Sequence, residues 1–478
     1  MTDNDANNTN LAFEPATKLH EMIAEKEISP VELTRLYLDR IEKLNPVLNA
    51  YLTVDPDRAL DAARQAEEAV TRGDELGPLH GVPISIKDLQ ITKGLRTTGG
   101  SAIFKNRVPK EDSIAVERIR AAGAIILGKT NTPEFGLLGV TVNKLGEGTR
   151  NPWNPDRTTG GSSGGAAAAT VAGLCALAEG SDGGGSIRIP SSFCGIFGIK
   201  PTQGRVPKYS GANIAPAANH FSQAGPMTRT VRDAAVLFQV MAGHDGRDPS
   251  SIREPVPNLV SALDRDAKGL SVGWSPDYGY SPVDPEVSRV CREALVGLSE
   301  AGSTVADSDL ALDNPFEPFH TLFGAMAFTA YGSLLDSDLT DYARNMIEHG
   351  ATVSGADYAL ALGHMDRIRA SIEEQLDRFD VVASPTLSVP AFKAGGPLDT
   401  VTEIDGQEVD PWWGYFPFTF PINMAGLPAV SIPAGFSAEG LPIGLQLVGK
   451  RGAEETLITL AAALERTRPW AQHRPQVS

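Results

Sequence analysis

The chain has 478 residues, of which 41% are hydrophobic and 21% are charged, so it can build a large core and is not disordered as a whole. Its 59 acidic residues outnumber its 42 basic ones, and the net charge of −17 argues against unaided binding to nucleic-acid backbones. Cys175, Cys194 and Cys291 lack the paired spacing of a disulfide framework or a zinc site, which predicts reduced, buried thiols.

The predicted elements begin with helices. Residues 15–45 show the apolar pattern of two amphipathic helices, with Ser29 as the N-cap of the second, and residues 56–72 predict a third. We expect residues 1–75 to form a helical segment packed on a core domain of residues 76–470. The first ten residues are polar and no apolar run approaches the ~20 residues of a membrane helix, which predicts a cytoplasmic protein.

From residue 81 onward the pattern predicts strands that alternate with helices. Residues 81–89 (GVPISIKDL) alternate with the period of a strand, and a helix over 114–122 leads into an apolar strand at 124–130. Further strand-like runs lie at 270–274, 380–383, 429–433 and 444–448. This alternation predicts a mixed α/β fold. The more helical range 250–375 is expected to form a cap over the core.

Two glycine-rich loops flank a predicted buried helix of small residues over 166–178. The first loop spans residues 149–165 and contains GGSSGG, and the second spans 180–186 and contains SDGGGS. Glycine allows positive φ and close approach of the backbone to a ligand, and successive N–H groups in such a loop can converge on one developing negative charge. Two solvated turns are the alternative for either loop alone, but the pair predicts a catalytic site.

Two known sequence motifs occur in this chain, but neither has the flanking secondary structure that its function requires. Residues 123–130 (GAIILGKT) match the phosphate-binding loop, which requires a strand before the loop and a helix after it. Here Ala124–Leu127 reads as a core strand instead. Residues 160–164 (GGSSG) match the nucleophile elbow of Ser-His-Asp hydrolases, which follows a strand directly, whereas a polar, turn-rich segment precedes them here. The histidines from His220 to His473 have no distinguishing setting, so a Ser-His-Asp site is only the weaker alternative.

A serine nucleophile needs a base, and Lys87 is the candidate because it stands in an otherwise apolar strand. An ordinary lysine is almost wholly charged at neutral pH. Burial beside hydroxyls, with no close carboxylate, would lower its pKa into a useful range. An ion-paired lysine at the edge of the core is the alternative.

Taken together, several long motifs resemble the amidase signature family. They are GVPISIKD, GKTNTPEFG, NPWNPDRTTGGSSGGAAAA and GSDGGGSIRIPSSFCGIFGIKPT, with further matches at 224–235, 379–386 and 423–449. The resemblance covers most of the chain. It implies a single α/β/α domain around a central twisted mixed β-sheet covered by helices.

The resemblance also implies a Ser-Ser-Lys triad that cleaves amide carbon–nitrogen bonds. Ser186 matches the acylated nucleophile, Ser162 the bridging serine that follows a cis peptide bond, and Lys87 the base. The matching oxyanion hole consists of Gly183, Gly184, Gly185 and Ser186. The matching residues that brace the loops are Ser163, Asp182 and Arg188. No metal or organic cofactor, nucleic acid or membrane is implied, and monomer and homodimer are both open.

The sequence gives less information about the substrate than about the reaction. One branch of the family, the A subunit of the aminoacyl-tRNA amidotransferase, hydrolyses glutamine and holds its ammonium with an acidic residue. Phe416 aligns with that residue, and no counterpart of the branch's arginine pair occurs in 351–360. The aromatic run 411–420 fits an apolar or aryl substrate, or simply a core. A stand-alone amidase acting on small aliphatic or aryl amides, anilides, carbamates or esters is therefore expected. The alternatives are a catalytically silent scaffold and the glutamine-hydrolysing amidotransferase component.

Overall fold

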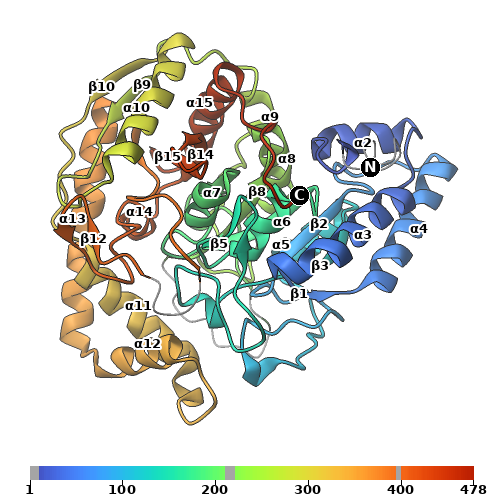
Figure 1. The fold of residues 1–478 in the computed structure, drawn as a ribbon, viewed down its shortest axis with the longest axis horizontal. Coiled ribbons are helices and arrows are strands. Elements are labelled where there is room, and N and C mark those ends of the chain that lie inside the picture. The colour runs from blue at the N-terminus through green and yellow to red at the C-terminus, as the bar shows by residue number, and fades with distance from the viewer. Residues whose placement is uncertain (1–9, 210, 212–220, 395–399) are drawn as a thin grey trace.

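An eleven-stranded sheet runs through the molecule and helices flank it (Figure 1). The computed structural model describes residues 10–209, 211, 221–394 and 400–478. The strands of the sheet are β1 (Tyr51–Val54), β2 (Pro83–Lys87), β3 (Ile125–Thr130), β6 (Leu177–Asp182), β7 (Phe197–Lys200), β8 (Gln223–Thr228), β9 (Ser271–Trp274), β10 (Thr304–Asp307), β11 (Val381–Pro385), β14 (Ala429–Phe436) and β15 (Pro442–Gly449). Two short hairpins pair β4 (Arg150–Asn151) with β5 (Asn154–Thr158), and β12 (Glu403–Ile404) with β13 (Gln407–Glu408).

The sheet is mixed, as the sequence predicts. Its order is β1-β3-β2-β6-β8-β7-β14-β15-β11-β9-β10. Strands β3, β2 and β6 are parallel, as are β11, β9 and β10, and the strands between these two groups pair antiparallel. The parallel trio matters for function, because the carboxyl ends of β2 and β6 lie at one edge of the sheet.

Fourteen helices lie in the ranges that the structure describes. They are α2 (Ala16–Ala24), α3 (Pro30–Leu48), α4 (Pro56–Arg72), α5 (Ile114–Ala121), α6 (Gly164–Val171), α7 (Arg188–Cys194), α8 (Val231–Met241), α9 (Leu259–Ala262), α10 (Pro285–Glu300), α11 (Phe316–Tyr331), α12 (Asp341–Thr352), α13 (Gly355–Arg378), α14 (Phe420–Ala425) and α15 (Glu454–Thr467). The predicted N-cap is confirmed, since the Ser29 side chain accepts hydrogen bonds from the first turn of α3 and forms a capping box with Glu32.

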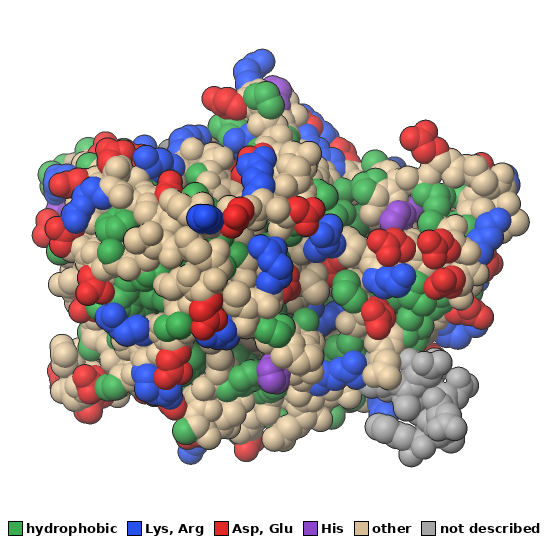
Figure 2. Space-filling view, turned by 90° about the horizontal axis from the view of Figure 1, so that it is seen from above, with side chains coloured by type: hydrophobic (Ala, Val, Ile, Leu, Met, Phe, Trp, Pro, Cys, Tyr) green, Lys and Arg blue, Asp and Glu red, His purple; other side chains and the backbone are tan. Residues whose placement is uncertain are grey.

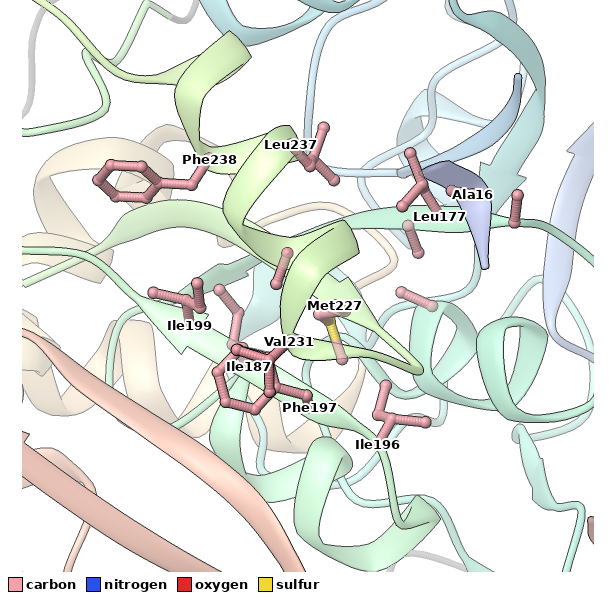
Figure 3. Packing of buried hydrophobic residues seen from close by; sticks show 14 of the residues in the cluster. Ala16, Leu177, Ile187, Ile196, Phe197, Ile199, Met227, Val231, Leu237 and Phe238 are labelled. Carbon is pink, nitrogen blue, oxygen red and sulfur yellow. The ribbon is translucent and has the colours of Figure 1, made fainter. Parts of the chain in front are cut away.

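Helices α8, α10 and α15 contact one another through α15 and form a layer over the central strands. Figure 3 shows how α8 packs: Val231, Leu237 and Phe238 lie close to side chains of the neighbouring strands, among them Met227 and Phe197. Helices α6 and α7 contact each other and the same strands, and so place the two glycine loops beside the sheet.

The helix predicted over residues 166–178 is only half right. Helix α6 ends at Val171, and Leu177–Asp182 forms strand β6 in the middle of the sheet. Gly173, with a φ of +65°, lies in the turn between them. Every residue of both elements is buried, so the run has no polar face whose period could separate helix from strand.

The range 250–375 contains two strands of the sheet, β9 and β10, as well as helices. Helices α11 and α12 pack on each other, and α11 also packs on α13 (Figure 1). The cap over the core and the boundary at residue 75 stay predictions.

The surface seen in Figure 2 carries acidic and basic side chains interspersed with apolar ones. All three cysteines are buried and free, as predicted. Within the described ranges, no helix has both the length and the apolar character needed to cross a bilayer.

Candidate active site

Lys87 is the last residue of β2 and is completely buried. Its Nζ lies 2.8 Å from Ser162 Oγ, 2.7 Å from Ser163 Oγ and 3.2 Å from the carbonyl oxygen of Ser181. The hydroxyl neighbours predicted for this lysine are therefore present. No carboxylate lies within ion-pairing distance of its Nζ in the described part of the chain.

Burial lowers the pKa of the Lys87 ammonium to about 7, against the opposing effect of the negative charges of Glu179 and Asp182. The expectation of no close carboxylate is corrected by Glu179, whose Oε2 accepts a hydrogen bond of 3.1 Å from the main-chain N–H of Lys87. Desolvation still has the larger effect, so a substantial share of this amine is neutral near pH 7 and can accept a proton.

Ser162 and Ser163 lie just before helix α6, and the Gly161–Ser162 peptide bond is cis, as the resemblance implies. The loop packs too tightly for side chains, since a Cβ on Gly161 would lie 2.8 Å from the carbonyl carbon of Val140. Ser163 also donates to the Ser181 carbonyl at 3.1 Å, so the first glycine loop is joined to the end of β6. This packing sets the two hydroxyls beside the lysine.

Ser186 lies next to this pair. Its carbonyl oxygen accepts a hydrogen bond of 3.2 Å from the Ser163 N–H, which joins the two glycine loops directly. Its side chain is partly exposed and its hydroxyl has no hydrogen-bond partner in the ranges that the structure describes. The Ser162–Ser186 hydrogen bond that a proton relay requires is thus not formed in this conformation.

Four N–H groups are predicted to form an oxyanion hole, and one of them already has an acceptor in the structure. The Gly185 N–H donates to Asp182 Oδ1 at 2.7 Å and is therefore occupied. The N–H groups of Gly183, Gly184 and Ser186 have no acceptor among the described residues, so three of the four predicted donors remain available. Gly185 instead holds the loop to Asp182, at a φ of +131°.

Asp182 and Arg188 form a fully buried, bidentate ion pair. Nε of Arg188 lies 2.9 Å from Oδ2 of Asp182, and Nη2 lies 3.0 Å from Oδ1. Although burial raises the pKa of Asp182, the charge and hydrogen bonds of Arg188 hold it well below its usual range. The carboxylate also accepts the N–H of Ile187 at 3.2 Å, so this pair fixes the shape of the Ser186 loop.

Two residues that sequence reasoning does not find complete this network. Arg188 donates to Asn423 Oδ1 at 2.5 Å and to Gln446 Oε1 at 2.7 Å, and Asn423 Nδ2 donates back to Asp182 Oδ1 at 2.9 Å. Nothing in their local sequence identifies them as partners, because they lie more than 230 residues after Arg188 in the chain.

A cluster of aromatic rings lies against the same loop. Phe319 of α11 is so close to Gly184 that a Cβ there would lie 2.9 Å from its ring. The rings with centroids within 6 Å of Phe319 belong to Phe221, Phe323, Trp413 and Phe420. From the 411–420 run, Thr419 also donates to the Gly184 carbonyl at 2.7 Å. The run therefore contacts the loop that carries Ser186.

The two alternative motifs do not form the sites that they suggest. Ala124–Leu127 leads into and forms β3, so the phosphate-loop match lies in a buried strand. No histidine in the described ranges hydrogen-bonds to Ser162 or Ser186, and His220 lies outside them. The Ser-His-Asp alternative therefore has no support in this geometry.

Comparisons with known proteins identify the family. The family model described as Amidase matches residues 32–458. The chain belongs to the amidase signature family. It is an amidase that is 37% identical to an acylamidase of Rhodococcus erythropolis, over 98% of both chains. It is also 39% identical to the A subunit of a glutamyl-tRNA(Gln) amidotransferase from Thermosynechococcus vestitus, over 96% of this amidase and 99% of that relative.

Among solved structures, the amidase superimposes on a bacterial aryl acylamidase with a TM-score of 0.90 at 32% identity, over 96% of this chain and 97% of that one. The sequence-based family assignment is confirmed, and with it the α/β fold. The amidase is a hydrolase of carbon–nitrogen bonds.

Proposed function

We propose that this amidase hydrolyses small linear amides with an apolar or aryl group, including anilides, and related carbamates and esters, through an acyl-enzyme on Ser186. The observation that supports this most strongly is the buried Lys87 amine, 2.8 Å from Ser162 Oγ and with no ion-pair partner among the described residues. Because no described carboxylate pairs with this amine, burial favours its neutral form, and the neutral amine can accept a proton.

The proposed reaction moves one proton along the three side chains. Neutral Lys87 accepts the proton of Ser162 while Ser162 accepts that of Ser186, whose oxygen attacks the carbonyl carbon. The free N–H groups of the Gly183–Ser186 loop stabilise the oxyanion. The Lys87 ammonium then returns its proton through Ser162 to the leaving nitrogen as the carbon–nitrogen bond breaks. Water, deprotonated by the same relay, hydrolyses the acyl-enzyme and restores Ser186.

The aromatic residues support the choice of substrate class. Phe319 against Gly184 places an apolar ring beside the proposed oxyanion site. Phe416, which aligns with the acidic residue of the glutamine-hydrolysing branch, is only 2% exposed and packs between the rings of Trp413 and Phe420. A free amino acid would find no counter-charge at Phe416, and the buried rings make the surroundings of the loop apolar, which favours an aryl group over a charged one.

A substrate panel tests this proposal. Purified protein is assayed with an anilide, an aliphatic amide, an aryl carbamate, an aryl ester and glutamine at equal concentration. We expect the anilide and the aryl ester to be hydrolysed fastest and glutamine not to be hydrolysed measurably. The aliphatic amide reports how much of the preference depends on the ring. Glutamine turnover above that of the anilide would overturn the proposal in favour of the glutamine-hydrolysing amidotransferase component, which the similarity to such a protein makes the second candidate.

The pH dependence of kcat/KM for an uncharged anilide should follow the protonation of Lys87. Burial places its pKa at about 7, and only the neutral amine accepts a proton. The rate should therefore rise with pH, reach half its maximum near neutrality and level off on the alkaline side. A kcat/KM that reaches half its maximum only near pH 10, the range of an ordinary lysine, would contradict this assignment. A rate that does not change between pH 6 and 9 would contradict it as well.

A further inference from the structure

Glu179 is a fully buried carboxylate in the fully buried strand β6, which pairs with the strand of Lys87. In the parallel pairing of β2 and β6 it lies opposite Ile86, the residue before Lys87. Its Oε2 accepts the Lys87 main-chain N–H at 3.1 Å, and its Oε1 accepts the Gln90 side-chain amide at 2.9 Å. Both oxygens are therefore held by groups that donate from the end of β2 and the turn after it.

This carboxylate has no cation within ion-pairing distance in the described ranges. An isolated buried charge is costly, and an apolar residue would fill the same strand position without that cost. Its two hydrogen bonds go to one main-chain N–H and one amide, neither of which needs a charged partner. The placement of Glu179 thus needs an explanation other than packing.

The charged groups around Glu179 belong to three adjacent strands. Lys87 ends β2, Lys129 lies in β3, and Asp182 ends β6, so two fully buried lysines lie on the next two strands on one side of that of Glu179. Lys129 Nζ donates to the Gln90 carbonyl, which links it to the same turn. Burial raises the pKa of Glu179, while the Gln90 hydrogen bond and the two lysines lower it. The further charged groups that act on Lys129 are Asp88, Arg107 and Asp112.

We propose that Glu179 is a positioning residue, which fixes the end of β2 and supplies the counter-charge for the ammonium that forms on Lys87 during the reaction. The inference rests on the proposed function. In each turnover a proton moves from Ser186 through Ser162 to Lys87 and later leaves for the departing nitrogen. Above its own pKa, which burial raises to about 7, Glu179 is negatively charged and stabilises Lys87 only while Lys87 carries the proton. A neutral residue at position 179 would remove one of the two negative charges, those of Glu179 and Asp182, that favour this ammonium.

The Glu179→Gln variant tests the charge, because glutamine keeps the size and one acceptor oxygen. Loss of the negative charge should lower the basicity of Lys87. The acidic limb, which is the rising part of the curve of kcat/KM against pH, should therefore move to lower pH by about one unit. The plateau rate should fall by up to about tenfold, because a weaker base takes the proton less readily. The rate of fluorophosphonate labelling of Ser186 against pH gives the same limb without reference to any substrate.

Glu465→Gln is the matched control. Burial raises the pKa of Glu465 to about 7 as well, but the groups that act on it are Val231, Asp233, Arg232 and Arg466, none of which belongs to the site. Its limb should coincide with that of the wild type. If Glu179→Gln does not fold, the Gln90→Met variant tests the role of Glu179 instead. This variant removes the donor that stabilises the Glu179 carboxylate at a partly exposed position, and should move the limb in the same direction by less.

An unmoved limb in Glu179→Gln, or one that moves to higher pH, overturns the role of Glu179. That result would leave the proposed function intact as long as a Lys87 variant is inactive. Normal activity of a Lys87 variant would instead refute the proposed function itself, whatever Glu179 does, so the two failures are distinguishable.

Discussion

Replacing Ser186 by alanine is expected to lower kcat for the best amide substrate by about 10⁶-fold, the magnitude typical of removing a serine nucleophile. The reason is that the acyl-enzyme can form only on this oxygen, while the loop N–H groups remain to bind the carbonyl. Intact-mass spectrometry after treatment with a fluorophosphonate should show one adduct on the wild type and none on the variant. The fold should be retained, because the Ser186 hydroxyl makes no hydrogen bond among the described residues.

Ser191→Ala is the matched control for this experiment. Ser191 lies in α7, five residues further on, and its buried hydroxyl also has no partner in the described ranges. The control should label and turn over like the wild type. An adduct that persists on Ser186→Ala would move the nucleophile to another residue, and Ser162 would then be the first candidate.

Replacing Lys87 by methionine is expected to lower kcat/KM for amides by about 10²–10⁴-fold, the usual contribution of general acid–base catalysis. Methionine fills the buried space of the lysine stem, so the loss should reflect chemistry and not a cavity. Circular dichroism and the thermal midpoint Tm report whether the fold survives. Labelling by fluorophosphonate should slow by a similar factor, since the same proton transfer activates Ser186.

The matched control is Lys200→Met. Lys200 is another fully buried lysine, whose pKa burial lowers to about 7, and the one hydrogen bond of its Nζ among the described residues goes to the Pro201 carbonyl at 2.8 Å. Its removal should leave the shape of the pH–rate curve unchanged. A Lys87→Met variant that retains activity within threefold of the wild type would exclude this amine as the base.

Secondary structure could be predicted wherever one side of an element differs from the other. The capped helix after Ser29 is an example, and it is present. The alternation at 81–89 also predicts a strand that is present, although β2 is buried on both sides. The failure at 166–178 lies in a run whose helix and strand are buried on all sides. There the boundary depends on the tertiary position of each residue, and a single sequence carries no record of that position.

The residues of the site that have an unusual local sequence could be predicted, whereas the contacts that depend on how the chain folds could not. Lys87 and the two serines of the first loop stand out because a cation in an apolar strand and serines among glycines are unusual. Glu179 gives a signal similar to that of Lys87, a charged residue in a buried strand, and could have been found by the same argument. That Gly185 donates its N–H to Asp182 depends on how the loop folds, which composition does not show.

The hydrogen bonds from Arg188 to Asn423 and Gln446 have a consequence for biosynthesis. The network around the serine loop is complete only when the chain as far as Gln446 has left the ribosome and docked. A nascent chain that already contains the lysine and both serines would still lack the side chains that hold the loop in shape. Hydrolytic competence is in this way tied to synthesis of the segment that carries Asn423 and Gln446, and a product truncated before that segment should be inert.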